Sequence, residues 1–330
     1  MPQCARFVAI HTGPNLADSS TAPLDRTTPL RLVLGFLVIY VVWGSTYLAI
    51  RIGLDTLPPF FMGSVRFLIA GSAMYAFSRW RGAPRPTLAE WKSSAVIGFL
   101  LLFVGNGSVS WAEQRVTSGM TSLLVGTVPL WLVLCEWVQG KPPRIAQVLG
   151  VVIGLVGVGL LVLPASGETN ATAVDPMGAL VLTVSALSWT VGSLYARTAN
   201  SAKPATLAIG MQMLVGGALL LILSAASGDL PRVAATTISR SSMLALLYLI
   251  VFGSLLGFSS YMWLLRVASP TAVGTYAYVN PVVAVLLGVF LAGEKLPPQA
   301  ILAMFVIVGG VALVSLAPHL GRGLKAAAGR

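Results

Sequence analysis

Residues 145–164 read IAQVLGVVIGLVGVGLLVLP and contain no charged side chain. An α-helix rises about 1.5 Å per residue, so twenty residues cover about 30 Å, the thickness of the hydrocarbon core of a bilayer. Lipid cannot hydrogen-bond to open backbone groups, so a spanning segment must be a helix or a strand of a closed barrel. This run lacks the alternation of polar and apolar residues that a barrel strand shows, and it therefore predicts a transmembrane helix.

Nine further apolar runs of similar length occur in the chain, separated by short polar or basic stretches. The predicted fold is therefore an all-α membrane protein with ten transmembrane helices. The ten predicted spans are Leu32–Ile50, Phe60–Phe77, Ala95–Ala112, Met120–Val138, Ile145–Pro164, Met177–Ala196, Thr206–Ala226, Met243–Leu265, Thr271–Ala292 and Pro298–Leu316.

The composition of the whole chain supports the same conclusion. Of its 330 residues, 56% are hydrophobic and 9% are charged, whereas a soluble globular protein carries roughly 25% charged residues. The chain holds 21 Lys and Arg against 10 Asp and Glu, a net charge of +11. In a membrane protein such an excess is typical of cytoplasmic loops, so we expect no binding of nucleic acid.

The sequence offers little to an enzyme or a cofactor. Its only cysteines and histidines are Cys4, Cys135, His11 and His319, so neither a disulfide framework nor a zinc site is expected. No GxxxxGK[ST] loop is present, so no ATP-hydrolysing domain of that type is expected. We predict no enzymatic activity, no metal and no cofactor.

The distribution of basic residues predicts the orientation in the membrane. With a cytoplasmic N-terminus, 15 Lys and Arg lie on cytoplasmic segments and 5 on external ones, which is the bias that cytoplasmic loops show. Both termini are then cytoplasmic, and the chain is a multi-pass protein of the plasma (inner) membrane. Residues 1–31 are predicted to form a disordered cytoplasmic tail, and residues 317–330 a short basic one.

The chain resembles itself at a nearly constant spacing. Residues 32–164, with spans one to five, form the first predicted repeat, and residues 177–316 form the second. Five is an odd number, so the second repeat enters the membrane inverted relative to the first. The spacing grows from 146 to 152 and 155 along the chain, so that Trp43 matches Trp189, Arg66 matches Gln212, Pro129 matches Pro281 and Gly154 matches Gly309.

Inverted repeats are typical of secondary transporters, whose substrate site lies near the bilayer midplane where the two repeats meet. The pattern therefore predicts alternating access around a central cavity between two five-helix halves. Duplication also produces channels and membrane scaffolds, and these stay open as alternatives.

Several motifs add a family resemblance to this pattern. They are Trp43-Gly44-Ser45-Thr46-Tyr47, Arg66, Pro129, Asn280-Pro281, Gly293-Glu294-Lys295 and the glycine-rich fifth and tenth spans. In these features residues 31–317 resemble the EamA-type ten-helix exporters of the drug/metabolite transporter superfamily. The resemblance implies export of amino acids and other small metabolites, with aromatic amino acids among the substrates of some relatives. The first repeat departs from the pattern, because Gly140-Lys141 stands where the second repeat has Glu294-Lys295.

Aromatic and polar residues near the middle of the spans are the candidates for substrate binding. Trp43 and Trp189 are expected either to pack helices together or to wall a central cavity, since headgroups cannot reach an indole at mid-span. Tyr47 lies one turn from Trp43 on the same helix face. The full candidate set is Trp43, Tyr47, Arg66, Asn106, Ser110, Trp189, Gln212, Tyr276 and Asn280.

Arg66 is the clearest ionisable group within a span. Its side chain is expected either to snorkel to the headgroups or to face the cavity, where it would hold a substrate carboxylate or an internal carbonyl. Gln212, its repeat mate, is expected at a similar depth from the opposite side. Glu113 and Glu136 lie near span ends and are expected at the membrane interface, although either could carry a coupling proton.

Pro129 and Pro281 are repeat mates near mid-span, and each removes a helix hydrogen bond. They are expected either to kink a helix for packing or to act as hinges for gating. The glycines of the fifth and tenth spans, including Gly150 and Gly154, predict close helix packing, and the GxxxG pattern could instead support a homodimer.

Together these features predict a secondary transporter in the lipid bilayer that exports small organic metabolites. Amino acids, aromatic ones included, suit a cavity that offers aromatic faces and neutral hydrogen bonds. A passive facilitator of the same solutes is the nearest alternative, and a membrane-embedded sensor or scaffold is a more distant one.

Overall fold

The computed structural model describes residues 29–162, 175–268, 270–294 and 298–328, and every regular element in these ranges is helical. The chain divides into two units, residues 1–34 and residues 35–330. Of the predicted N-terminal tail, residues 1–28 lie outside the described residues, and helix α1 already begins at Pro29. The first unit is therefore represented by residues 29–34 of α1.

The first five predicted spans contain the following elements. They are α1 (Pro29–Leu37), η2 (Val38–Val42) and α2 (Trp43–Gly53); α3 (Pro59–Trp80); α4 (Leu88–Ile97), η3 (Gly98–Asn106) and α5 (Gly107–Ala112); α6 (Ser118–Val125) and α7 (Val128–Val138); and α8 (Ile145–Val162).

The last five predicted spans contain a similar series of helices, and an additional helix, α11, lies between the seventh and the eighth span. The elements are α9 (Pro176–Thr198); α10 (Ala205–Ala226); α11 (Asp229–Ala235); α12 (Arg240–Tyr248), η4 (Leu249–Phe258) and α13 (Ser259–Val267); α14 (Pro270–Val273) and α15 (Tyr276–Ala292); and α16 (Pro298–Ala328).

The prediction of an all-helical membrane protein is confirmed. Eight helices in the described part of the chain are long and apolar enough to cross a membrane, and two shorter apolar helices, Ile145–Leu160 and Tyr276–Ala292, occupy the fifth and ninth predicted spans. The structure adds detail to three predicted segments. The fourth span has a break between Val125 and Val128, the ninth has a break between Val273 and Tyr276, and α16 continues as a helix to Ala328.

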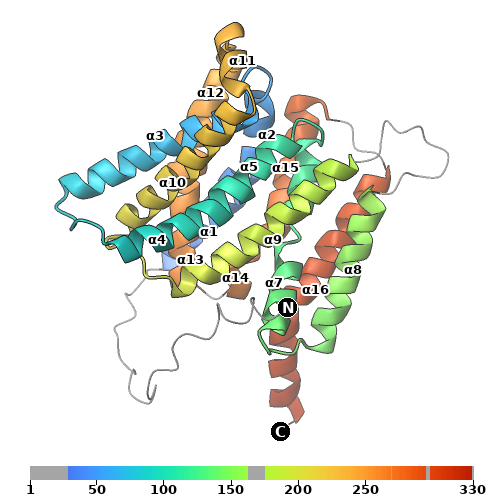
Figure 1. Ribbon diagram of the computed structural model, residues 1–330. Coiled ribbons are helices and arrows are strands. Elements are labelled where there is room, and N and C mark those ends of the chain that lie inside the picture. The colour runs from blue at the N-terminus through green and yellow to red at the C-terminus, as the bar shows by residue number, and fades with distance from the viewer. Residues whose placement is uncertain (1–28, 163–174, 269, 295–297, 329–330) are drawn as a thin grey trace, which may run out of the picture. The chain divides into compact units, whose positions relative to one another are not determined.

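Two long seams join helices from different repeats. Helix α3 runs beside α10, and α8 runs beside α16 (Figure 1). At the first seam a Cβ added to Gly71 would lie 2.8 Å from the backbone nitrogen of Leu214. At the second, a Cβ on Gly150 would lie 2.7 Å from the carbonyl oxygen of Gly310. Glycine lets these backbones approach closely, and the glycine face of α8 is thereby occupied by a helix of the same chain.

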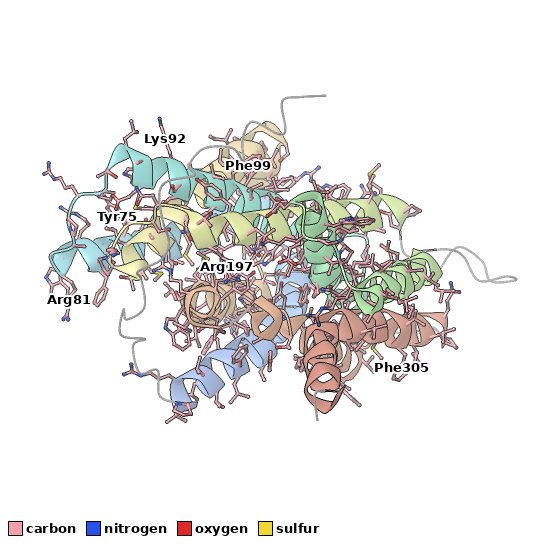
Figure 2. The ribbon with its side chains drawn as sticks, turned by 90° about the horizontal axis from the view of Figure 1, so that it is seen from below. Tyr75, Arg81, Lys92, Phe99, Arg197 and Phe305 are labelled. Carbon is pink, nitrogen blue, oxygen red and sulfur yellow. The ribbon has the colours of Figure 1, made fainter. Side chains whose placement is uncertain are left out.

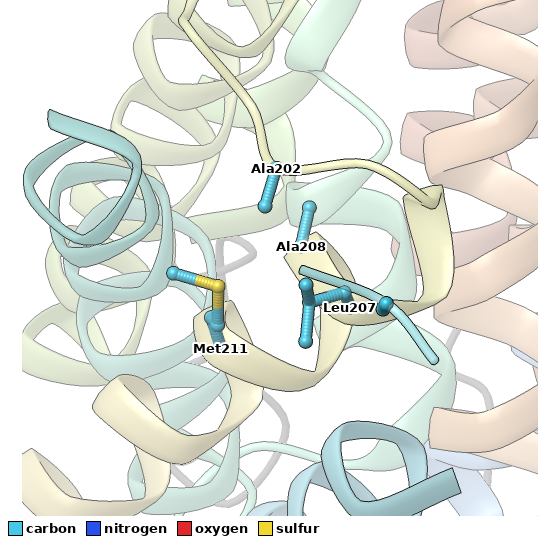
Figure 3. Packing of buried hydrophobic residues seen from close by; sticks show 5 residues of the cluster. Ala202, Leu207, Ala208 and Met211 are labelled. Atoms are coloured by element: carbon cyan, nitrogen blue, oxygen red, sulfur yellow. The ribbon is translucent and has the colours of Figure 1, made fainter. Parts of the chain in front are cut away.

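The outward surface of the helices is largely apolar, as contact with lipid requires. Figure 2 shows Phe305 projecting from α16, and this side chain is 68% exposed. Arg81 and Lys92 lie at the edge of the α3 and α4 region in the same view. A buried cluster packs near the start of α10, and Figure 3 shows Ala202, Leu207, Ala208 and Met211 within it.

Three segments of the spans are π-helical, namely η2, η3 and η4. The segments η3 and η4 occupy equivalent positions in the two repeats, since the spacing of 152 places Gly98–Asn106 on residues 250–258. A π-helix is wider than an α-helix and is frequent at functional sites. Residues of η3 and η4 line the central cavity described below, and η2 ends directly before the lining residue Trp43.

Candidate functional site

A cavity of about 60 Å³ lies inside the second unit, with walls from both repeats. This volume is enough for several water molecules. Its lining consists of Trp43, Thr46, Tyr47, Ile50, Arg66, Phe67, Leu102, Gly105, Asn106, Val109, Val125, Ser185, Trp189, Gly253, Phe258, Tyr276 and Asn280. We call it the central cavity. Seven of the nine residues predicted to bind substrate belong to this lining, and the other two are Ser110 and Gln212.

Four aromatic rings from four spans form one cluster beside the cavity. Trp43 meets Trp189 edge to face with ring centroids 5.5 Å apart, and it also lies 4.9 Å from the ring of Tyr261 and 5.9 Å from that of Tyr276. The indole N–H of Trp189 donates to the Tyr261 hydroxyl at 3.0 Å, and that of Trp43 donates to the Gly253 carbonyl at 3.2 Å. Both indoles thus find polar partners at mid-span.

A second cavity of about 50 Å³ lies on the other side of the aromatic cluster. Tyr276 lines both cavities, and Tyr261 and Arg197 line only the second. Arg197 lies at the end of α9 that is predicted to be cytoplasmic, whereas Ile50 and Val109 of the central cavity lie toward the predicted outer end. With this predicted orientation, the aromatic cluster lies between an outer and an inner compartment.

Arg66 is the charged residue of the central cavity. Its side chain is 6% exposed, its Nε donates to the Ser254 hydroxyl at 2.7 Å, and its guanidinium stacks 4.8 Å from the Phe67 ring. A Cβ on Gly253 would lie 2.8 Å from Nη2. Among the described residues no ion pair is found for Arg66. The guanidinium thus points to η4 and the cavity instead of snorkelling to the end of its span.

The two candidate asparagines have their amides engaged by π-helical backbone. The Asn280 amide is oriented with its nitrogen toward η2, where it donates to the carbonyls of Ile39 at 2.9 Å and Tyr40 at 3.1 Å. The Asn106 amide donates to the Leu101 carbonyl at 3.4 Å in η3. A π-helix displaces carbonyls from the usual ladder, and these side chains satisfy them while they border the cavity.

Ser110 and Gln212 do not reach either cavity lining. Ser110 is 4% exposed and lies one residue beyond the lining residue Val109. Gln212 is 0% exposed, and neither of its amide atoms has a hydrogen-bond partner in the part of the chain that is described. Its backbone carbonyl lies against Gly98 of η3, so Gln212 sits in the packing between α10 and the third span.

The two repeat-related prolines have different structural roles. Pro129 lies in the first turn of α7, just after the break in the fourth span, and it lines the inner cavity. Pro281 lies inside α15, where its missing N–H leaves the Ala277 carbonyl without its helical partner. That carbonyl lies 3.0 Å from where a Cβ of Gly126 would be. The proline-containing turn of the ninth span therefore meets the break of the fourth.

Several residues of the site were not among the sequence candidates. Thr46, Phe67, Ser185, Gly253 and Phe258 line the central cavity, and Ser254 and Tyr261 hold lining side chains. Small polar residues and aromatics are common throughout the spans, so their type does not separate them from packing residues. Spacing within η3 and η4 is also misleading, because a π-helical turn shifts the face that later residues present.

An all-helical membrane protein with a polar and aromatic cavity shared by two sequence repeats has the architecture of a membrane transporter. The chain belongs to the EamA-like transporter family, whose sequence model matches residues 30–163 and 176–316. The predicted resemblance is thereby confirmed. This family consists of transporters rather than enzymes.

Two relatives and one solved structure are similar to the chain over most of its length. The chain is 41% identical over 288 residues to the "Uncharacterized inner membrane transporter YedA" of Escherichia coli K12, covering 86% of this chain and 90% of the relative. It is 24% identical to the chloroplastic WAT1-related protein At3g02690 of Arabidopsis thaliana, covering 84% and 67% of the two chains. A solved crystal structure shares the fold with a TM-score of 0.61 at 23% identity, covering 87% of this chain and 98% of that one.

Proposed function

We propose that the protein is a secondary transporter that exports small organic carboxylates, amino acids among them, across the plasma membrane by alternating access. Both termini are cytoplasmic in this proposal. The observation that carries the substrate class is Arg66, a buried guanidinium on the central cavity that has no acidic partner among the described residues. A charge within a span is costly unless it is paired or wet, and a substrate carboxylate would supply the missing partner.

The aromatic cluster supports a substrate with an apolar or aromatic side chain. Trp43 and Trp189 present ring surface to the central cavity next to Tyr276. Aromatic rings attract one another in edge-to-face and offset geometries. Alternating access then requires the cluster to part, because it stands between the outer and the inner cavity.

Counterflow into proteoliposomes tests this proposal. Vesicles loaded with one unlabelled solute are offered a trace of the labelled solute, with amino acids, their amides and decarboxylated amines compared side by side. We expect the carboxylates to exchange and the matching amides and amines to fail. Exchange that ignores the carboxylate would contradict the proposed role of Arg66.

The Arg66→Lys variant tests the same point on the protein. Lysine keeps the charge but cannot form the planar two-pronged contact of a guanidinium with a carboxylate. We expect strongly reduced exchange at a normal protein level. Arg81→Lys, an exposed position just after the same helix, is the matched control and should exchange normally.

A passive facilitator of the same solutes is the nearest alternative. It would exchange solutes in counterflow as well, but it could not accumulate a solute against its gradient. Accumulation driven by an imposed ion gradient therefore distinguishes the two.

A further inference from the structure

Glu113 follows α5 directly and is enclosed by protein. The residue is 0% exposed, and neither carboxylate oxygen has a hydrogen-bond partner among the described residues. An ionised carboxylate without a partner in such a place is strongly disfavoured, whereas a neutral carboxyl group costs far less to bury. The enclosure alone therefore favours the protonated form of Glu113.

The charged groups around Glu113 come from several elements. From α2, the Arg51 guanidinium donates to the backbone carbonyl of Glu113 at 2.8 Å, and the Tyr47 hydroxyl also lies within electrostatic reach. After α15, Glu294 lies within electrostatic reach. At the start of α9, Asp175 accepts from the Gly178 amide at 2.9 Å. Helix α3, which also packs on α5, carries Arg66 in the central cavity.

A further basic residue lies close to Glu113 in the sequence. On the segment after Glu113, Arg115 stacks 4.7 Å from the Trp111 ring. Lys295 follows Glu294 in the sequence and lies outside the described residues.

Glu294 ties the end of the ninth span to the start of the fourth. Its two carboxylate oxygens accept from the backbone amides of Ser118 at 2.9 Å and Gly119 at 3.3 Å, at the N-terminus of α6. A negative charge is favourable there because the first amides of a helix have no helical partner. The Ser118 hydroxyl beside it is 0% exposed and has no partner among the described residues. We call this contact of the Glu294 carboxylate with the Ser118 and Gly119 amides the Glu294 latch, because it joins the end of α15 to the start of α6.

The two acidic groups influence each other. Burial raises the pKa of the Glu113 carboxyl well above its ordinary value, the charge of Glu294 raises it further, and Arg51 lowers it by a smaller amount. Only one of the two groups has hydrogen bonds that favour its ionised form, and that group is Glu294. Glu113 is therefore the member of the pair that can bind a proton.

The pair lies at the predicted outer end of the central cavity. Val109, one helical turn before Glu113, lines the cavity, and so do Tyr47 and Ile50 of α2. The segment from Glu113 to Ser118 links the third and fourth spans just beyond that wall. A movement of this segment would therefore open or close the cavity toward the outside.

We propose that Glu113 and Glu294 form a proton-binding site that couples the proton gradient to transport. While Glu113 is protonated, Glu294 stays bound to the N-terminus of α6, and the outer end of the cavity stays closed. When Glu113 releases its proton toward the cytoplasm, its enclosed carboxylate repels the half-buried carboxylate of Glu294, the latch loosens, and the outer end opens. In each cycle the substrate leaves the cell and a proton enters it, so the protein exchanges protons for substrate across the membrane. This inference rests on the proposed function for its transport step.

The transport arm of the test uses the purified full chain in proteoliposomes with amino acid as substrate. In the wild-type protein an imposed pH gradient should drive accumulation beyond the counterflow level. The Glu113→Gln variant mimics the protonated form in shape and charge, so its outer end should stay closed, and it should lose both counterflow exchange and gradient-driven accumulation. Glu90→Gln, at an exposed helix cap, is the matched control and should respond like the wild type. Equal gradient response in the Glu113→Gln variant would overturn the proposal.

An accessibility arm needs no substrate. A cysteine replaces Thr121, which is 0% exposed in the first turns of α6, in a background without Cys4 and Cys135. Its alkylation by a membrane-impermeant maleimide should rise with pH more steeply than ionisation of the thiol itself explains, and this excess should vanish with Glu113→Gln. With Glu294→Gln the midpoint should shift to lower pH, because the charge that raises the Glu113 pKa is gone.

The two arms distinguish the two proposals. Absence of counterflow for every carboxylate would refute the proposed function, and the accessibility arm would then decide on the latch alone. An excess of alkylation at high pH, beyond what ionisation of the thiol explains, supports the latch if it is lost with Glu113→Gln. Alkylation without this excess, or with an equal excess in the Glu113→Gln variant, overturns it.

Discussion

Trp43 and Trp189 lie 146 residues apart, occupy matching positions of the two repeats, and meet edge to face with ring centroids 5.5 Å apart. The contact brings the first spans of the two repeats together between the outer and inner cavities. Each indole also donates a hydrogen bond, so neither side chain is held by packing alone.

Replacing either tryptophan should separate packing from transport. We expect Trp43→Ala and Trp189→Ala to reduce counterflow strongly while the variants still insert and purify as folded protein, whereas Trp43→Phe should retain part of the activity because a ring remains. Counterflow rate and the monodisperse yield after size-exclusion chromatography measure the two properties. A parallel loss of yield and transport would instead assign both residues to packing.

Gly253→Ala should displace Arg66 without changing its charge. The new methyl group would lie 2.8 Å from Nη2 of Arg66 and 3.1 Å from Cγ2 of Thr46. We expect weaker exchange of carboxylates, seen as a raised KM in counterflow. Gly309→Ala is the matched control, because nothing lies within 4 Å of that position. An unchanged KM for Gly253→Ala would show that the guanidinium position does not matter for the substrate.

Pro281→Ala restores a backbone N–H that can reach the Ala277 carbonyl. The added hydrogen bond should stiffen α15 where it meets Gly126, and this should change turnover more than substrate affinity. Pro129→Ala should change turnover less, because a proline in the first turn of a helix removes no helical hydrogen bond. Maximal exchange rate and apparent affinity are measured separately for both variants. Wild-type turnover in both would exclude a hinge role.

The stability of the protein should depend on pH through Glu113. The pKa of this carboxyl is raised in the folded state, so folding binds a proton and the associated stability is complete below the ordinary pKa of glutamate. It is lost as pH rises through the raised value. We expect the wild-type Tm to fall across this window relative to that of Glu113→Gln, and the difference to level off above it. A constant Tm difference at all pH values would contradict this.

The orientation can be tested directly in cells. Single cysteines in the loop of residues 165–176 should react with an impermeant reagent added from outside, whereas cysteines placed at Arg81 or Arg266 should not. The charge distribution of the loops motivates this expectation. Labelling of the 165–176 loop only after the membrane is permeabilised would reverse the predicted topology.

Hydrophobic run length and repeat spacing were sufficient to predict the helical membrane fold, because the bilayer imposes a fixed length on each span. The same reasoning placed Trp43, Trp189 and Arg66 near the middle, and the structure gathers them on one cavity. It failed for Gln212, since inversion fixes the depth of a repeat mate but not the direction in which its side chain points.

The π-helical segments were beyond sequence reasoning. Nothing in Gly98–Asn106 or Leu249–Phe258 distinguishes a wide turn from an ordinary apolar helix. The role of Asn280 follows from such a segment, because its amide serves carbonyls of η2 that an α-helix would have satisfied internally. Glu113 was expected at the membrane interface on its position alone, and its complete enclosure depends on tertiary packing.

The seams between α3 and α10 and between α8 and α16 also constrain the synthesis of the chain. Helix α3 ends at Trp80 and α10 begins at Ala205. At a synthesis rate of about 5–20 residues per second, α3 is complete on the order of ten seconds before its partner is made. Arg66 waits longer still, until Ser254 of the eighth span emerges from the ribosome. In the newly made first half, the glycine faces of α3 and α8 and the charge of Arg66 therefore still lack their partners. We expect the insertion machinery to shield them until the second half is made.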